Sequence, residues 1–129
     1  MRFTGCDPLR PSELTRALSY NGKIWDLRND AEFQLFLFDR KERALVFHWK
    51  YFENDDSRTL LRLEFLNVSS FAVKSRDPGM PFLEDDCLSA IVFDGKVDRF
   101  LIAFMGGQAI RVYCSELKLS TQDWPYDEK

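Results

Sequence analysis

The chain has 129 residues, of which 45% are hydrophobic and 30% charged, and its formal net charge is −3. This length and composition are typical of one folded domain, here residues 1–129, and not of a disordered or fibrous chain. The acidic balance argues against nucleic-acid binding, and no stretch approaches the ~20 consecutive apolar residues of a membrane span.

The N-terminal part predicts an irregular arm followed by one short helix. Residues 1–11 contain two prolines, and we expect them to lack regular structure. Ser12 can cap a helix, and Asn21-Gly22 would end it because both residues tolerate a left-handed conformation. The apolar residues at helical spacing are Leu14, Ala17 and Leu18.

From residue 33 onward the apolar pattern is that of short β-strands. Residues 33–38 carry apolar side chains on both faces, which predicts a central strand, and residues 39–43 turn the chain into a second strand over 44–52. Residues 59–66 alternate most clearly. In this strand the residues expected to face inward are Leu61, Leu63 and Phe65, and those expected to face solvent are Arg62 and Glu64.

The C-terminal half predicts further strands joined by tight turns. Asp77-Pro78-Gly79 has the residue order of a type II turn, and Asp94-Gly95 and Gly106-Gly107 are typical hairpin turns. Residues 110–119 alternate between apolar and polar side chains, and residues 121–129 form a polar tail. We therefore predict a mainly β fold, an antiparallel barrel or sandwich of about seven strands with one short N-terminal helix.

Few residues of this chain are candidates for catalysis. His48 is the only histidine, and no nucleophile motif lies near it, so we interpret it as a half-exposed strand residue and predict no catalytic residue. The three cysteines are widely spaced and no apolar signal peptide precedes them, which predicts free thiols and a cytoplasmic location. They are Cys6, Cys87 and Cys114.

The segment from Met80 to Asp86 is the strongest candidate for a binding site. Two apolar residues, Phe82 and Leu83, are followed at once by three carboxylates, Glu84, Asp85 and Asp86. An apolar anchor with a charged rim is typical of protein interfaces, and the carboxylates favour a basic partner. These carboxylates lack the alternating spacing and the glycine of a calcium loop, so we predict no metal and no cofactor.

Three segments of the chain, residues 65–71, 85–91 and 106–114, follow one another in a characteristic order. In this order of features the chain resembles small uncharacterised bacterial proteins, some of which are immunity proteins for polymorphic toxins. The resemblance implies a cytosolic, single-domain protein that binds and blocks a cognate toxin, and it implies no catalytic residue.

Three functions are compatible with these features. The first is a non-enzymatic protein-binding module of the immunity-protein kind. The second is a barrel that binds a small apolar ligand, and the third, ranked last, is an enzyme that uses carboxylates alone. The aromatic residues expected to line the barrel are Phe33, Phe36, Phe47, Trp49 and Phe104. The sequence leaves the oligomeric state open.

Overall fold

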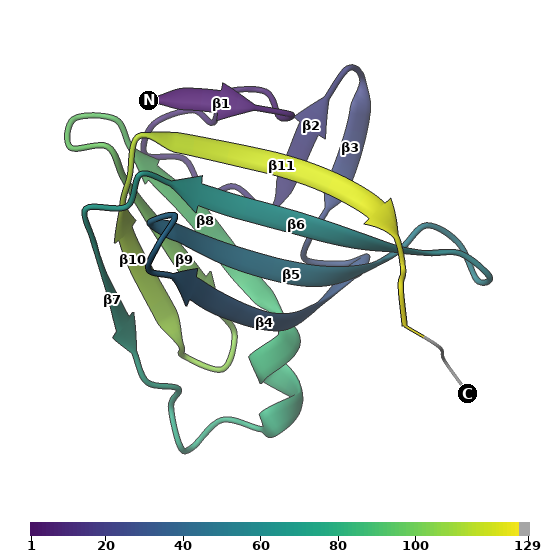
Figure 1. Ribbon diagram of the computed structural model, residues 1–129. Coiled ribbons are helices and arrows are strands. Elements are labelled where there is room, and N and C mark those ends of the chain that lie inside the picture. The colour runs from purple at the N-terminus through teal and green to yellow at the C-terminus, as the bar shows by residue number, and fades with distance from the viewer. Residues whose placement is uncertain (127–129) are drawn as a thin grey trace.

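Two β-sheets packed face to face, with a two-stranded hairpin beside them, make up the computed structural model, which describes residues 1–126 (Figure 1). The larger sheet contains β1 (Arg2–Thr4), β4 (Ala31–Asp39), β5 (Ala44–Phe52), β6 (Arg58–Leu66) and β11 (Glu116–Asp123). The second sheet contains β7 (Ser70–Lys74), β8 (Leu88–Asp94), β9 (Arg99–Phe104) and β10 (Ala109–Tyr113). The hairpin is β2 (Ala17–Tyr20) with β3 (Lys23–Asp26), and a one-turn 3-10 helix, η1, spans Phe82–Asp86.

The strand order leaves both large sheets open. The larger sheet runs β1-β11-β6-β5-β4 and the second runs β7-β10-β9-β8. All pairings are antiparallel except that of β1 with β11. The mainly antiparallel β class is therefore confirmed. The barrel alternative is wrong, because the sheets do not close on each other, and the described residues form eleven strands instead of about seven.

Aromatic rings fill the space between the two sheets. Phe65 of β6 meets Phe100 of β9 at 5.1 Å between ring centroids, and Phe33 of β4 meets Phe104 of β9 at 4.6 Å. Leu63 lies on the same inner face of β6 as Phe65 and is fully buried, as its alternation predicts. Burial of this kind, at about 25 cal/mol per Å² of apolar surface, is the main force that holds the two sheets together.

The predicted N-terminal helix is absent, and a β-hairpin stands in its place. Asn21 and Gly22 both have positive φ, 51° and 81°, as a two-residue type I′ turn between strands requires. The hairpin buries Leu18 and Trp25 against the core. The i, i+3, i+4 spacing of three apolar residues was too short a signal to separate a helix from a strand.

The arm and the tail are more ordered than the sequence predicts. Within residues 1–11, β1 pairs with β11, and Cys6 and Leu9 are buried in the core. The predicted tail of residues 121–129 begins inside β11, which continues to Asp123, and its last three residues lie outside the described part of the chain. Backbone pairing with a neighbouring strand has thus ordered segments that have little apolar periodicity of their own.

The strand β4 was predicted to be central, but it is an edge strand. A register shift between Phe33 and Leu35 inserts an extra residue, so that Phe36 packs inward while Leu35 and Leu37 are turned out. Apolar residues on both faces suggested burial on both sides. In the structure the outer face of β4 carries two leucines that no second layer of residues 1–126 covers.

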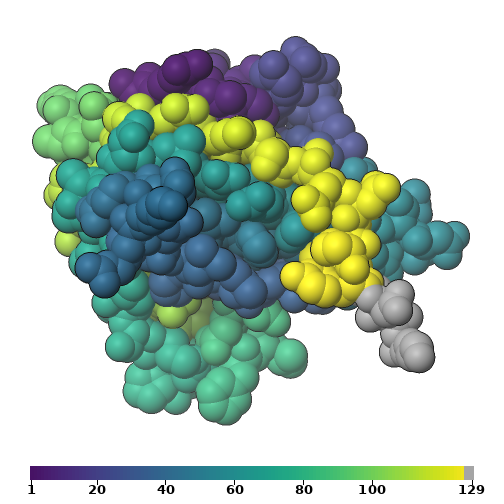
Figure 2. Space-filling view, viewed as in Figure 1, coloured from purple at the N-terminus to yellow at the C-terminus, as the bar shows by residue number. Residues whose placement is uncertain are grey.

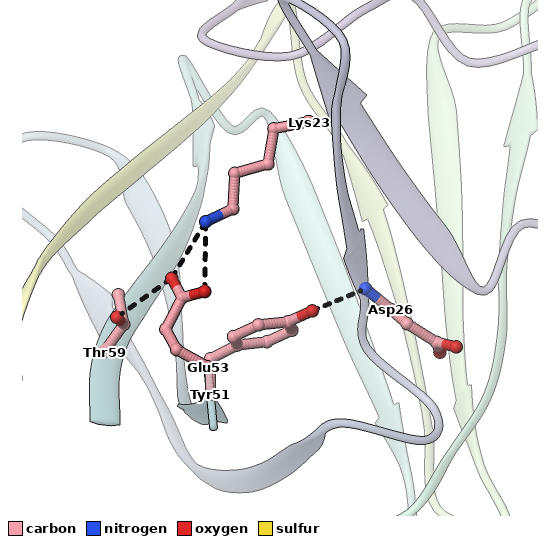
Figure 3. Close-up of polar contacts among 5 residues, drawn as sticks. All are labelled: Lys23, Asp26, Tyr51, Glu53 and Thr59. Carbon is pink, nitrogen blue, oxygen red and sulfur yellow. Dashed lines mark hydrogen bonds and ion pairs between the residues drawn. The ribbon is translucent and has the colours of Figure 1, made fainter. Parts of the chain in front are cut away.

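Polar contacts attach the β2-β3 hairpin to the larger sheet (Figure 3). Lys23 Nζ lies 3.0 Å from both carboxylate oxygens of Glu53, and the hydroxyl of Thr59 donates to one of them at 3.3 Å. The amide of Asp26 donates to the hydroxyl of Tyr51 at 3.3 Å. In Figure 1 the hairpin stands at the top of the molecule and η1 lies at the bottom.

Candidate protein-binding loop

The loop of residues 75–87, which contains η1, lies at the lower margin of the molecule (Figures 1 and 2). It joins β7 to β8 and therefore leads from one edge of the second sheet to the other. Asp77 and Met80 form a turn in which the Met80 amide donates to the Asp77 carbonyl at 3.1 Å. The predicted turn is confirmed, but type II is wrong, because φ of Gly79 is not positive.

Backbone hydrogen bonds fix loop 75–87 to the turn between β9 and β10. The amide of Asp77 donates to the carbonyl of Gly106 at 2.8 Å, and the amide of Gly106 donates to the carbonyl of Glu84 at 3.1 Å. The amide of Met105 donates to the carbonyl of Cys87 at 2.8 Å. The loop is long, yet its two halves are attached to the same rigid hairpin turn.

Arg76 connects the two halves of the loop through its side chain. Its Nε lies 2.9 Å from both carboxylate oxygens of Asp85, and its Nη2 donates to the carbonyl of Met80 at 2.8 Å. The guanidinium carbon lies 4.6 Å from the ring centroid of Phe82, within the range of a cation–π contact. One arginine thus holds a carboxylate, a backbone carbonyl and an aromatic ring in fixed relation.

The apolar pair of the predicted site is almost fully exposed. Phe82 has 79% of its surface accessible and Leu83 has 85%, the highest values among the large hydrophobic residues of the described chain. Phe82 therefore does not fold back into the core. Two neighbouring apolar side chains that remain in solvent on an ordered loop are typical of an interaction surface.

The three carboxylates of the predicted site differ in what they do. Asp85 is engaged by Arg76, and its carboxylate occupies the space where a side chain on Gly106 would lie. Asp86 is exposed as a whole residue, but its carboxyl group has lost part of its contact with water. This partial burial raises the pKa of the Asp86 carboxyl above the usual range, and the negative charge of Asp85 raises it further. Glu84 is half-buried and its side chain makes no hydrogen bond to the described residues. Glu84 and Asp86 are therefore the two of these three acids that Arg76 does not engage.

Cys87 lies at the end of η1 among these acids. Partial burial raises the pKa of its thiol, and the charges of Glu84, Asp86 and Glu32 raise it further against the opposing effect of Arg28. The thiolate form is disfavoured, so this thiol is a poor nucleophile at neutral pH. The influence of Glu32 also indicates that the start of β4 adds a carboxylate to the same neighbourhood.

Sequence reasoning found the exposed residues of this loop but missed Arg76. Its nine-residue separation from Asp85 follows no helical or strand periodicity, so only the folded loop brings the two together. The residues next to Arg76 in the sequence do not indicate that Asp85 is its partner. The Gly106-Gly107 turn was predicted, but its role as the support of loop 75–87 depends on long-range contacts.

The aromatic residues that were expected to line a ligand-binding barrel lie in the packed interior. Phe33, Phe47, Trp49 and Phe104 are buried and pack against one another, with the ring centroids of Phe33 and Phe47 5.8 Å apart and those of Phe47 and Trp49 5.7 Å apart. Phe36, at 5.7 Å from Phe47, covers the same cluster. The rings expected to line a ligand cavity instead fill the interior with each other.

Comparison with known proteins identifies no relative of this chain. No protein family, curated protein or solved structure matches this chain. Within residues 1–126, no group of three or more histidine, cysteine, aspartate or glutamate side chains is arranged to hold a metal ion. The single short helix of the same residues is neither long nor apolar enough to cross a membrane.

Proposed function

We propose that this protein is a non-enzymatic protein-binding module and that loop 75–87 is the surface that contacts its partner. The observation that carries the proposal is the exposure of Phe82 and Leu83 on a loop that Arg76 holds in one conformation. Moving each of these side chains from water into an interface is favourable by roughly 1.5–3 kcal/mol. They are the anchor residues of the proposed contact.

Preorganisation of the loop supports the same proposal. A flexible loop loses conformational freedom when it binds, at a cost of about 0.5–1.5 kcal/mol for each side chain that becomes ordered. The bonds from Arg76 to Asp85 and to Met80 order the loop before any partner arrives. The free acids, Glu84 and Asp86, would attract a basic surface and accelerate association more than they slow dissociation.

The resemblance to immunity proteins suggests the class of partner to test first. A toxin that acts on nucleic acid presents a basic surface, since it must approach phosphates. An acidic protein with an apolar anchor is complementary to such a surface. We therefore propose a cognate toxin with a basic active face as the partner of loop 75–87.

Site-specific cross-linking in cells tests this proposal. A benzophenone amino acid at position 82 should capture a defined protein, and the same amino acid at position 24 is the matched control, because Ile24 is also an exposed apolar residue, at 65%. Purified partner should then bind Phe82→Ala at least about tenfold more weakly, while Ile24→Ala binds normally. Identical capture at both positions, or unchanged affinity of Phe82→Ala, would contradict the proposal.

A further inference from the structure

The outer edge of β4 is open and uncharged along its middle. No hydrogen bond joins the backbone of residues 33–38 to any described residue outside β5. Past the register shift, Leu35 to Phe38 contain no charged residue and no proline. Leu35 and Leu37 have 42% and 44% of their surfaces accessible, and in Figure 2 the blue residues of β4 and of the turn that follows it lie open on one face. Natural proteins normally blunt such edges with charge, proline or a cover, so this edge is suited to pair with another strand.

The other three edges of the two large sheets are shorter or covered. β1 is only three residues long. The edge of β8 is covered by the N-terminal segment, where Thr15 bridges to Ile91 and the amide of Ser12 donates to the carbonyl of Phe93 at 2.8 Å. β7 is five residues long and ends on Lys74. The nine-residue β4 is therefore the edge best suited to accept another strand.

The turn that follows β4 carries a net positive charge. Residues 39–43 contain two acids and three bases, so their formal charge is +1. Arg43 donates to the carbonyl of Val68 at 2.8 Å, whereas Arg40 and Lys41 are exposed and their side chains make no hydrogen bond or ion pair with the described residues. The charged side chains beside this turn on the larger sheet cancel one another, and they are Arg62, Glu64, Glu116 and Lys118.

The start of β4 has no such excess of positive charge. Two acids and two bases lie there, and they are Arg28, Asp30, Glu32 and Lys50. Lys50 is opposite Glu32 on β5, and the side chains of Asp30 and Glu32 are exposed. Because these four formal charges cancel, the sign of the potential at this end depends on what packs beside it.

The short helix η1 makes the start of β4 acidic. η1 packs against β4, and the charges of Glu32, Glu84 and Asp86 all raise the pKa of the Cys87 thiol, so these acids lie close together. The third acid of η1 is already paired with Arg76. Glu84 and Asp86 therefore add two negative charges to a balanced group. The strand is polarised along its length, with negative charge at its start and positive charge at the turn after it.

We propose that the β4 edge pairs with the β4 edge of a second copy of this chain, antiparallel and about a two-fold axis at Phe36. Leu35 of each copy then lies opposite Leu37 of the other, and apolar cross-strand pairs of this kind stabilise a sheet. Main-chain hydrogen bonds join the two larger sheets into one. The acidic start of each β4 meets the basic turn of the other copy, so the attraction between opposite charges occurs twice, as the symmetry requires.

The opposite charges at the two ends favour this occupant over the alternatives. A segment that is basic at both ends would be repelled by the turn, and a segment that is acidic at both ends would be repelled at the start of β4. A second copy in parallel orientation would bring like ends together. An antiparallel copy alone carries the required polarity by its own sequence, and the net charge of −3 on each copy opposes the contact weakly, because salt screens charges more than about 8 Å apart.

Charge reversal at the two ends tests the pairing in the full-length protein. Sedimentation equilibrium should detect a dimer of the unmodified chain at protein concentrations between about 10 μM and about 1 mM, since a small interface gives a weak complex. The turn variant is Arg40→Glu with Lys41→Glu, and the start variant is Asp30→Lys with Glu32→Lys. Each variant alone should dimerise at least about tenfold more weakly, because like charges then meet at both ends.

An equimolar mixture of the two variants should form a heterodimer within about threefold of the native affinity. In the mixture each reversed end meets a reversed end and each native end meets a native end, so both contacts are again attractive. A native chain that stays monomeric at about 1 mM would overturn the inference and favour a segment of a different protein at this edge. Normal dimerisation of either variant alone, or a mixture that stays monomeric, would also overturn it.

Matched edge variants locate the contact. Leu37→Lys should weaken the dimer at least about tenfold, whereas Val73→Lys, which adds the same charge at an equally exposed residue of the β7 edge, should leave it within about twofold. The reverse order would refute the assignment to β4. The inference goes beyond the proposed function, because self-association of the purified chain needs no other protein. Dimerisation and cross-linking at position 82 can therefore each fail without the other.

Discussion

Gly5 is the position at which the structure tolerates a side chain least. Its φ is +72°, and a Cβ there would overlap the backbone carbonyl oxygen of Leu119 on β11. Gly22 is a matched control, since its φ is +81° and no atom lies within 4 Å of an added Cβ. Alanine at either glycine should cost about 1–2 kcal/mol for the left-handed backbone alone.

The additional cost at Gly5 comes from the displacement of β1. To relieve the overlap, the strand must move away from β11 and withdraw Phe3 from its edge-to-face contacts with Phe93 and Phe100, at 5.6 and 6.2 Å. Each such ring pair contributes about 0.5–1.5 kcal/mol beyond the area that it buries. We therefore expect Gly5→Ala to lower the free energy of unfolding by about 2–5 kcal/mol, against about 1–2 kcal/mol for Gly22→Ala.

Urea denaturation followed by tryptophan fluorescence measures both free energies. Amide exchange provides a second readout, because detachment of β1 should deprotect amides that pair β1 with β11 in Gly5→Ala and leave those of β6 protected. Equal losses of stability in the two variants would show that β1 does not lie against Leu119 as described.

Further predictions concern the core, the thiols and the single histidine. Leu63→Ala should lower the free energy of unfolding by about 2–5 kcal/mol, whereas Arg62→Ala should change it by less than about 1 kcal/mol, and the reverse order in chemical denaturation would contradict the register of β6. At neutral pH, N-ethylmaleimide should modify the half-buried Cys87 before the buried Cys114, because burial raises the pKa of the Cys114 thiol to about 12. Mass spectrometry after limited labelling gives the order of modification. Burial, and then the charge of Arg62, lowers the pKa of His48, so the unfolded chain binds that proton more readily and stability should fall as the pH drops below 6.5. His48→Gln should lose this part of the pH dependence in urea midpoints measured at several pH values, and an unchanged slope would refute it.

The alternation of apolar residues was sufficient to predict the central strands. In β6 the residues at every second position are those that the core buries, because a strand with one covered face has no other stable register. The Gly106-Gly107 turn was equally readable, since few residue pairs suit a tight hairpin. These features depend only on neighbours in the sequence.

The errors occur where distant contacts determine the structure. Asn21-Gly22 is a strong hairpin signal, but it followed three apolar residues at helical spacing, and the core contact of Trp25 that favours the strand is not visible locally. The edge position of β4 depends on which strand stops pairing, and its register shift moves the inward face by one residue. The role of Arg76 depends on a carboxylate nine residues away, in a loop without periodicity.

The parallel pairing of β1 with β11 has a consequence for synthesis on the ribosome. β11 is the last strand of the described chain, and it lies between β1 and β6 in the larger sheet. Until β11 has left the exit tunnel, β1 has no strand to pair with and one side of β6 is an open edge. Strands β4 to β6 can form a meander early, but the apolar side chains of Phe3 and Phe65 remain exposed to solvent until the larger sheet is complete. Nascent chains of this protein should therefore remain targets for chaperones that bind exposed apolar segments until Asp123, the end of β11, has left the exit tunnel, when the core can close in a single late step.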